Sequence, residues 1–405
     1  MITIGKRPID LGSMGLTLIL FANICFYNQK MAYLFWIISA LGIVLTIISV
    51  IAHNRLVLRK KTFPLWIIVI YSMFILYQMI ALRAGDFNWD TLIWRAVESL
   101  CIYAVIVNDL RMGRKFDWPF IVSGFLAIIM VLRNELEVIL SGYLRIGTTL
   151  SGNENTVGFA FGIISLVIMW TCCQEGLNNN KIKMIFFIVF TAFMLVSGSK
   201  KTIVFLAANI LIYFYYNRNR LTGWIKVLLI VSVILYVIFG VEYFYNIIGY
   251  RIIDAVETLI LGKNVSKNVY SYSTDVRYDM IIEAFRLFKE YPILGGGYNY
   301  FAQKTVYGYG YSHCNYTELL CSFGIIGTIL FYSRHIYQLK FSIKAWLFHK
   351  KYSQDIMLLG IVLTVLILIT EIGAVTFSAQ SLWYLPITIS AACYDYLHET
   401  ECMYK

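Results

Sequence analysis

Apolar runs of about 20 residues dominate this sequence, roughly the length that an α-helix needs to cross the hydrocarbon core of a bilayer. Irregular backbone cannot face lipid because its polar groups would lose their hydrogen bonds, so each run predicts a membrane-spanning helix. The composition agrees, with 59% hydrophobic and only 14% charged residues. The twelve runs lie at residues 11–27, 31–51, 64–82, 91–108, 118–140, 156–173, 182–198, 202–216, 223–241, 315–333, 355–371 and 381–397.

The expected fold class is an all-α polytopic membrane protein with about 12 transmembrane helices. One long hydrophilic stretch interrupts the apolar pattern between the ninth and the tenth run. We therefore expect a single integrated domain in three parts. These parts are an N-terminal membrane bundle of about nine helices at 1–241, an extracytoplasmic loop at 242–314, and about three C-terminal membrane helices at 315–405.

Basic segments predict the orientation, because Lys and Arg in short loops stay preferentially on the cytoplasmic side of a membrane. Such segments follow every second apolar run, so both termini are expected in the cytoplasm and the long loop outside. The net charge of +11 is then mainly a topology signal, and nucleic acid is not an expected partner. The basic segments are 53–61, 109–115, 178–183, 217–220 and 333–351.

The long loop contains a pattern typical of a short amphipathic helix. Residues 273–275 can cap a helix start, apolar residues then recur at helical spacing, and Pro292 with three glycines ends the pattern. The prediction is a helix over about 275–290 with Arg277 in its first turn. Arg277 is either a solvated surface charge or a functional cation.

Histidine placement singles out one residue for outer-face chemistry. Four of the five histidines fall in the expected inner segments, at His53, His335, His349 and His398. His313 alone falls outside, where a group that titrates near neutral pH can act as a general base. The alternative is a polar residue at the membrane interface. Glu318 is expected either as a structural partner or as an acceptor behind the histidine.

Lys200 and Lys201 lie in a tight turn on the expected outer face, against the positive-inside trend. A charge in such a place is a functional candidate, and Lys binds phosphate as a point charge. The alternative is a simple turn whose lysines reach the headgroup level. Arg145 is expected on the same side. Arg95 and Glu98 are three residues apart on one helix and are expected to satisfy each other.

A glycine pair, Gly324 and Gly327, follows His313 in the tenth apolar run. The two glycines are one helical turn apart, so one stripe of the helix has no side chains. We expect another helix to approach closely there and to hold His313 and Glu318 rigidly. No CxxC-type metal spacing and no nucleotide-binding glycine motif is present, so no metal and no cofactor is expected.

The stretch from His313 through Cys314, nine further residues, Gly324, two residues and Gly327 resembles the motif of the O-antigen ligase and O-antigen polymerase superfamily. Three other segments resemble that superfamily in the same order, and together they cover roughly residues 150–335. The sequence departs from the usual pattern at Cys314, where Asn, Ser or Gln is usual, and at Lys200, where Arg is common. The segments are GNENTVGFAFGI at 152–163, SGSKKTIVF at 197–205 and the outer-loop stretch 277–301.

This resemblance implies transfer of a glycan from an undecaprenyl diphosphate carrier to a sugar hydroxyl, at the outer face of a bacterial cytoplasmic membrane and without a metal or nucleotide. It implies catalytic roles for His313 and Arg277 and structural roles for Gly324 and Gly327. The residues expected to bind substrate are Lys200, Lys201, Arg145, Asn153, Asn155, Asn315 and Glu318.

Several functions remain open. A polymerase joins lipid-linked repeat units for exopolysaccharide, capsule or O-antigen, whereas a ligase transfers the glycan to lipid A core. Richness in Ile, Lys, Asn and Tyr is typical of low-GC bacteria, many of which have no lipid A, and favours the polymerase. A flippase or other transporter would need charges through the membrane midplane. A glycan-binding assembly partner would not need His313. Expected partners are the lipid-linked donor and acceptor and membrane lipid, with a chain-length regulator and a flippase as further candidates.

Overall fold

The computed structural model describes most of the chain. The described residues are 2–4, 7–27, 32–52, 62–80, 89–141, 145–147, 153–176, 179–219, 221–253, 269–306, 308, 310–348, 351–379 and 381–402. Three expectations lie outside the described part. They concern the basic segment 53–61 with His53, the residue His349, and the side chains at 273–275 that were expected to cap a helix.

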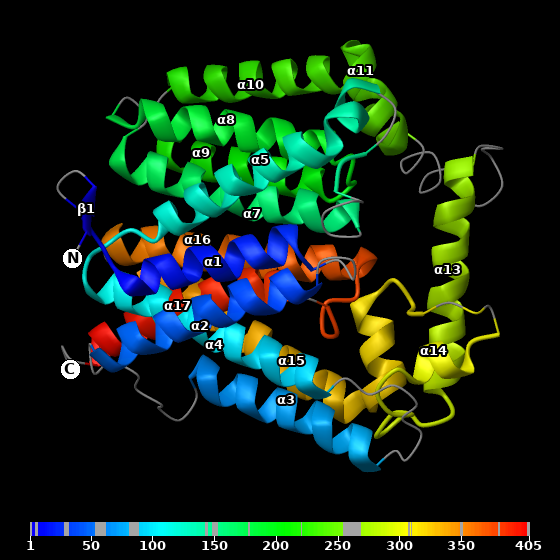
Figure 1. The fold of residues 1–405 in the computed structure, drawn as a ribbon. Coiled ribbons are helices and arrows are strands. Elements are labelled where there is room, and N and C mark those ends of the chain that lie inside the picture. Colours follow the sequence, from blue (N-terminus) through cyan, green and yellow to red (C-terminus); the bar gives the residue numbers. More distant parts are fainter. Residues whose placement is uncertain are drawn as a thin grey trace. The chain divides into compact units, whose positions relative to one another are not determined.

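Each of the twelve apolar runs forms or begins a helix, which confirms the all-α polytopic class (Figure 1). Apolar side chains on all sides and few helix-breaking residues favour helices in these runs. The twelve helices are α1 (Leu11–Cys25), α2 (Ala32–Ala52), α3 (Phe63–Ile80), α4 (Trp89–Arg111), α5 (Asp117–Ser141), α7 (Glu154–Glu175), α8 (Lys181–Val196), α9 (Thr202–Asn217), α10 (Leu221–Gly240), α15 (Asn315–Phe348), α16 (Lys351–Thr370) and α17 (Ser381–Cys402).

Shorter elements fill the connections. A small antiparallel hairpin, β1 (Ile2–Ile4) and β2 (Arg7–Ile9), precedes α1 and pairs Ile2 with Ile9. The hydrophilic stretch contains α11 (Glu242–Phe244), the π-helical turn η3 (Tyr245–Gly249), α13 (Val269–Phe288) and α14 (Tyr300–Lys304), and the 3-10 turn η4 (Glu371–Gly373) follows α16.

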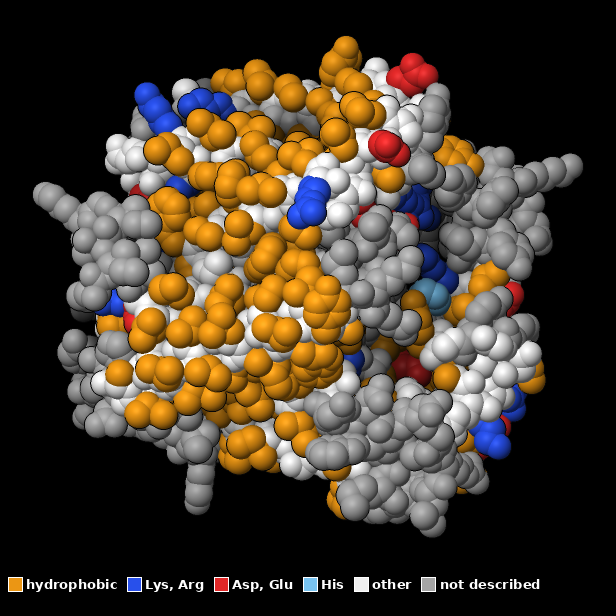
Figure 2. Space-filling view, in the orientation of Figure 1, with side chains coloured by type: hydrophobic (Ala, Val, Ile, Leu, Met, Phe, Trp, Pro, Cys, Tyr) orange, Lys and Arg blue, Asp and Glu red, His pale blue; other side chains and the backbone are white. Residues whose placement is uncertain are grey.

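Seven helices in the described part of the chain are long and apolar enough to cross a membrane. They are Ala32–Ala52, Thr91–Arg111, Asp117–Ser141, Glu154–Glu175, Thr222–Gly240, Asn315–Lys344 and Asp355–Gly373, and Leu11–Cys25, Phe63–Tyr77 and Thr202–Asn217 are shorter apolar helices. Large apolar side chains are exposed along α2, such as Ile37 and Ile51, and Figure 2 shows apolar side chains gathered over this helix. Such a face is stable only when lipid covers it.

Contacts divide the chain into two compact units. The first comprises Met1–Arg55 and Asn108–Val256, and the second comprises Leu56–Val107 and Glu257–Lys405. Each of these units combines two separate segments of the chain. The three parts expected from the sequence are consecutive segments, and that division stays a prediction.

In the first unit, α7 lies beside both α8 and α9 and is buried along almost its whole length (Figure 1). α1 and α2 pack closely, since a side chain at Gly42 would lie only 2.8 Å from the Gly15 carbonyl oxygen. At one end of the bundle, Lys183 of α8 pairs with Asp117 of α5 at 2.5 Å and with Glu175 of α7 at 3.0 Å. These ion pairs tie three helices together.

In the second unit, α15 continues to Phe348, whereas the sequence predicted a basic loop from residue 333. No glycine or proline lies between residues 328 and 348 to end the helix. Arg334 is buried because Asp395 of α17 pairs with it at 3.0 Å. His335 is therefore a buried helix residue, and its expected place in an inner loop is wrong.

The outer helix was correctly predicted to end before Pro292, but α13 begins at Val269 rather than near residue 275. Arg277 therefore lies in the third turn of α13 and not in its first. The expected bounds were wrong because sequence patterns mark helix starts least reliably.

Candidate functional site

His313 stands directly before α15, in the second unit, and its backbone is in the left-handed region with φ 59°. Residues other than glycine rarely adopt this conformation, so the surrounding structure must hold it. The His313 ring is half-buried and lies against the Tyr311 ring, with the two centroids 4.3 Å apart. The expected outer loop contains several tyrosines, and no local pattern distinguishes Tyr311 from the others.

Glu318 holds the loop that carries His313. Its carboxylate accepts a hydrogen bond from the Ser312 backbone N–H at 2.6 Å, and both residues are buried. The Ser312 hydroxyl also donates to the Cys314 carbonyl at 3.0 Å and contacts the Thr317 hydroxyl at 3.1 Å. Glu318 is thus a structural partner, one of the two roles left open by the sequence. Its expected contact with substrate stays a prediction.

Arg277 belongs to the same cluster. Burial lowers the pKa of its guanidinium, while the neighbouring Tyr311 phenol opposes that shift. Burial in turn raises the pKa of Tyr311, and Arg277 partly offsets this. Arg277 is only half exposed, so a freely solvated surface charge does not describe it. Arg277, Tyr311 and His313 therefore gather a cation, a phenol and an imidazole at the start of α15.

A break in α15 joins this helix to the turn after α13. Gly324 leaves the helical conformation, with φ 63° and ψ −167°. The turn then replaces the missing helical hydrogen bonds. The Gly296 and Gly297 N–H groups donate to the Cys321 and Ser322 carbonyls at 2.9 and 2.8 Å, and Ile325 N–H donates to the Pro292 carbonyl at 3.0 Å.

Gly295 and Gly324 allow the turn Pro292–Gly297 to enter the break in α15, because neither residue has a side chain. A Cβ at Gly324 would lie 2.6 Å from the Gly295 nitrogen, and a Cβ at Gly295 would overlap the backbone of Phe323 and Gly324. The sequence predicted that a helix approaches the glycine pair, and this was wrong at Gly324, where a turn makes the close approach. At Gly327 a Cβ would meet the Phe323 side chain of the same helix and would lie 3.7 Å from Met73 of α3, so a neighbouring helix does approach there. Only the tertiary fold brings Pro292–Gly297 to this point.

A small core reinforces the joint between α13 and α15. It consists of Met280, Ala284, Leu287, Tyr300, Phe301 and Cys321. At its edge the Tyr300 hydroxyl donates to Glu290 at 2.6 Å, and Arg286 pairs with Glu283 at 2.8 Å. The helix that carries Arg277 and the helix that follows His313 are therefore packed as one body.

Asn315, expected to bind substrate, is fully buried in a second polar network. Its side-chain oxygen accepts from the N–H groups of Thr376 and Phe377 at 2.9 and 3.1 Å, and its amide donates to the Tyr332 hydroxyl at 2.9 Å. Tyr332 in turn donates to Glu371 at 2.8 Å. Asn315 thus fastens the segment after η4 to α15, and its role toward substrate stays a prediction.

Arg95 and Glu98 were expected to satisfy each other, and this stays a prediction. Arg95 contacts the segment between η4 and α17, and Glu98 contacts the first residue of α17. Arg95 donates to the Ser378 carbonyl, and Glu98 accepts from the Ser381 hydroxyl. Glu98 also accepts from the indole N–H of Trp94 at 3.2 Å. These contacts attach α4 to the start of α17.

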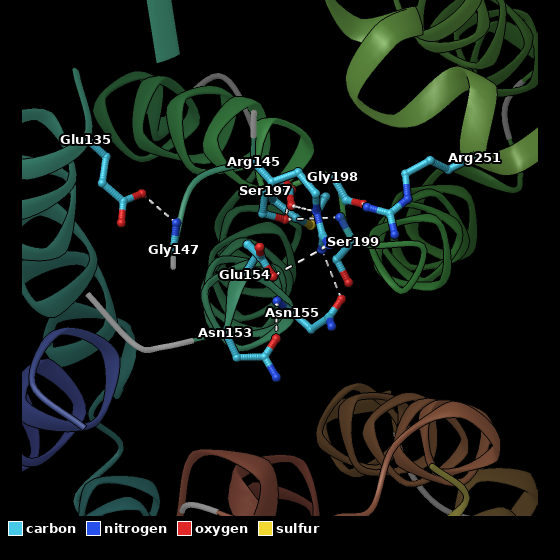
Figure 3. A network of polar contacts seen from close by, with 11 residues as sticks. Glu135, Arg145, Gly147, Asn153, Glu154, Asn155, Ser197, Gly198, Ser199 and Arg251 are labelled. Carbon is cyan, nitrogen blue, oxygen red and sulfur yellow. Dashed lines mark hydrogen bonds and ion pairs between the residues drawn. The ribbon is translucent and has the colours of Figure 1, made fainter. Parts of the chain in front are cut away.

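The first unit carries a separate polar cluster around the lysine turn (Figure 3). Arg145 donates from Nε to the Ser197 carbonyl at 2.8 Å and from Nη2 to Asn155 Oδ1 at 3.1 Å, and it pairs with Glu154 at 3.5 Å. Asn153 caps α7, because its side chain accepts from the Asn155 N–H at 2.9 Å. Asn153, Asn155 and Arg145, all expected to bind substrate, therefore lie together in one hydrogen-bonded group.

Lys200 and Lys201 lie in the turn between α8 and α9, and both are half-buried. The turn bends at Gly198, whose φ is 60°. Arg251 reaches this bend as well and donates to the Gly198 carbonyl at 3.3 Å. Sequence reasoning missed Arg251, because 53 residues separate it from its partner and no motif marks it.

Within the described residues, no group of three or more His, Cys, Asp or Glu side chains could hold a metal ion. The family model for O-antigen ligase matches residues 185–332, which confirms the resemblance to the O-antigen ligase and polymerase superfamily. That range includes the lysine turn, Arg251, Arg277, His313 and both glycines, whereas Arg145 and the two asparagines lie before it. No curated protein matches the chain. Residues 185–332 are therefore similar to members of that family, and the rest of the chain lies outside the match.

Proposed function

We propose, from the match of residues 185–332 to the O-antigen ligase family, that this protein polymerises lipid-linked oligosaccharide repeat units. It transfers a glycan from undecaprenyl diphosphate to a sugar hydroxyl of an acceptor on the outer face of the cytoplasmic membrane. The observation that carries this proposal is the gathering of Arg277, Tyr311 and His313 inside the matched range.

The proposed chemistry needs a base and a cation. His313 takes the proton of the acceptor hydroxyl as its oxygen attacks the anomeric carbon, and the bond from that carbon to the diphosphate oxygen breaks. The attack comes from the face opposite the diphosphate, so the configuration inverts. The leaving diphosphate gains negative charge, which Arg277 stabilises from a half-buried position where water screens charge less.

The lysine turn supports the same reaction. Lys200 and Lys201 are two cations in a bend between apolar helices, and phosphate oxygens are suitable ligands for them. We assign to them the binding of the anionic part of the donor. Arg145 uses its donors on Ser197 and Asn155, so we propose that it acts by supporting this turn.

The acceptor separates the polymerase from the ligase. A polymerase uses a second lipid-linked repeat unit, whereas a ligase uses lipid A core, and the amino-acid composition favours the polymerase. A chain-length regulator and a flippase remain candidate partners of the polymerase.

The test is glycan chain formation by the purified protein in liposomes that contain lipid-linked repeat units. We expect His313→Ala to reduce chain formation by about 10²- to 10⁴-fold, the usual scale for loss of acid–base catalysis, with unchanged donor binding. His398→Ala is the matched control, since His398 is an exposed residue near the C-terminus. Wild-type rates for His313→Ala would exclude the base assignment. Transfer to lipid A core but not to repeat units would identify a ligase.

A further inference from the structure

The lysine turn is held by two arginines that bind adjacent carbonyl groups. Ser197 is the C-cap residue that follows α8, and its carbonyl accepts from Arg145 Nε at 2.8 Å. The next carbonyl, that of Gly198, accepts from Arg251 Nη1 at 3.3 Å. Figure 3 shows both guanidinium groups directed at this bend. The last carbonyls of a helix lack partners within it and carry partial negative charge, so cations stabilise them there.

Each arginine is itself fixed by a different part of the first unit. Arg145 is tied to the start of α7 through Asn155 and Glu154. Arg251 follows η3, whose residues Ile247 to Gly249 are buried, and a Cβ at Gly249 would lie only 2.6 Å from the Ile238 carbonyl oxygen of α10. The two arginines thus connect the turn to α7 and to the η3 segment.

The bend leaves little freedom for the turn. A Cβ at Gly198 would lie 3.0 Å from Arg145 and equally close to Ile247, so both neighbours touch the bend. Ser197 donates from its hydroxyl to the Met194 carbonyl at 2.6 Å, and Thr202 donates to the Ser199 carbonyl at 2.7 Å. Lys200 and Lys201 follow the bend closely, so its conformation sets the direction in which their side chains leave the backbone.

We propose that Arg251 is a positioning residue which, together with Arg145, clamps the bend at Ser197 and Gly198 and so places Lys200 and Lys201 for an anionic diphosphate ligand. The ligand class rests on the proposed function, but the clamp does not. Placing two guanidinium groups beside two lysines concentrates positive charge, and Glu154 offsets part of it. Mutual repulsion of this kind favours an anionic ligand.

Arg251→Met tests the clamp, because Met keeps most of the side-chain length and loses both the charge and the donors. Hydrogen exchange of the backbone amides at 197–201 is measured without ligand in lipid nanodiscs, and the donor KM is measured in liposomes. We expect exchange at least about tenfold faster and a donor KM about tenfold higher, in line with the loss of a charged hydrogen bond. Arg218→Met is the matched control, since Arg218 donates to the Tyr215 carbonyl at the end of α9.

Lys200→Ala separates positioning from direct binding. It should raise the donor KM with exchange at 197–199 unchanged. The double variant Arg251→Met with Lys200→Ala should raise KM by less than the product of the two single effects, because part of the effect of Arg251 acts through Lys200. Additive effects on KM with normal exchange in Arg251→Met would make Arg251 a direct ligand and overturn the clamp.

Two further outcomes keep the clamp and the proposed function distinguishable. Faster exchange in Arg251→Met, with no transfer by any variant or by the wild type, would support the clamp and reject the proposed function. If Arg251→Met does not fold, Arg251→Gln decides, because it shortens the side chain and removes the charge. Wild-type exchange at 197–201 in the folded Gln variant would overturn the clamp.

Discussion

At the residue scale, several candidate side chains stabilise the nearby backbone through hydrogen bonds. Glu318 accepts a hydrogen bond from the Ser312 N–H, and the next residue, His313, has a left-handed backbone conformation that is uncommon for residues other than glycine. The loop therefore depends on one buried acceptor. The charge of Glu318 is not needed for that bond, because an amide oxygen can accept it equally.

At the residue scale we predict that Glu318→Ala lowers the free energy of unfolding by about 1–3 kcal/mol, because it leaves the buried Ser312 N–H without its acceptor. Glu318→Gln should retain most of the stability and most of the glycan transfer. The measurements are thermal unfolding in detergent and transfer in liposomes. Glu137→Ala, at an exposed position, is the control. If Glu318→Gln loses as much transfer as Glu318→Ala, the negative charge is what matters.

At the element scale, α15 shows how a helix can be broken without leaving its polar groups unpaired. The turn after α13 supplies two N–H donors and accepts from the helix beyond the break. In a segment expected to lie in a membrane, such replacement avoids the cost of unsatisfied backbone. The same turn connects α13, which carries Arg277, to α15, which follows His313.

We predict that Gly324→Ala disrupts this joint. A Cβ there would strike the Pro292–Gly297 turn, and its φ of 63° disfavours any L side chain. Strain and overlap together should cost about 3 kcal/mol or more, with loss of transfer. Thermal unfolding and size-exclusion profiles measure the effect. Gly373→Ala is the matched control, because open space surrounds that position. Normal stability of Gly324→Ala would mean that the turn can move away.

At the scale of the whole molecule, the alternation of basic turns predicts the orientation. Epitope tags in the turns near Gly113 and Asn219 should be protected in sealed cells, and a tag near Gly308 should be accessible. Permeabilised cells provide the control, since every tag should then react. The basic segment 333–351 offers no loop for a tag at residue 345, because that residue lies inside α15. Residues 55 and 265, in the expected inner and outer segments, lie outside the described residues. Labelling near Asn219 in sealed cells would contradict the predicted topology.

The positions of the spanning helices and the family resemblance could be predicted from the sequence, because the length and polarity of an apolar run are local properties and so is the spacing from His313 to Gly327. Local patterns failed where distant segments meet. Arg334 can be buried in the continued α15 because Asp395 of another helix pairs with it, and no local pattern shows that partner.

Only the tertiary structure decided how the candidate residues are held. The turn at Pro292 enters the break at Gly324, and Arg251 reaches Gly198 across 53 residues. Asn315 and Glu318 bind backbone groups within the fold. No local pattern predicts these contacts, because nearly every residue has the same backbone carbonyl and N–H groups. Tertiary packing determines which partner each group binds. The sequence therefore predicted the candidate side chains, whereas packing determined their conformations and supports.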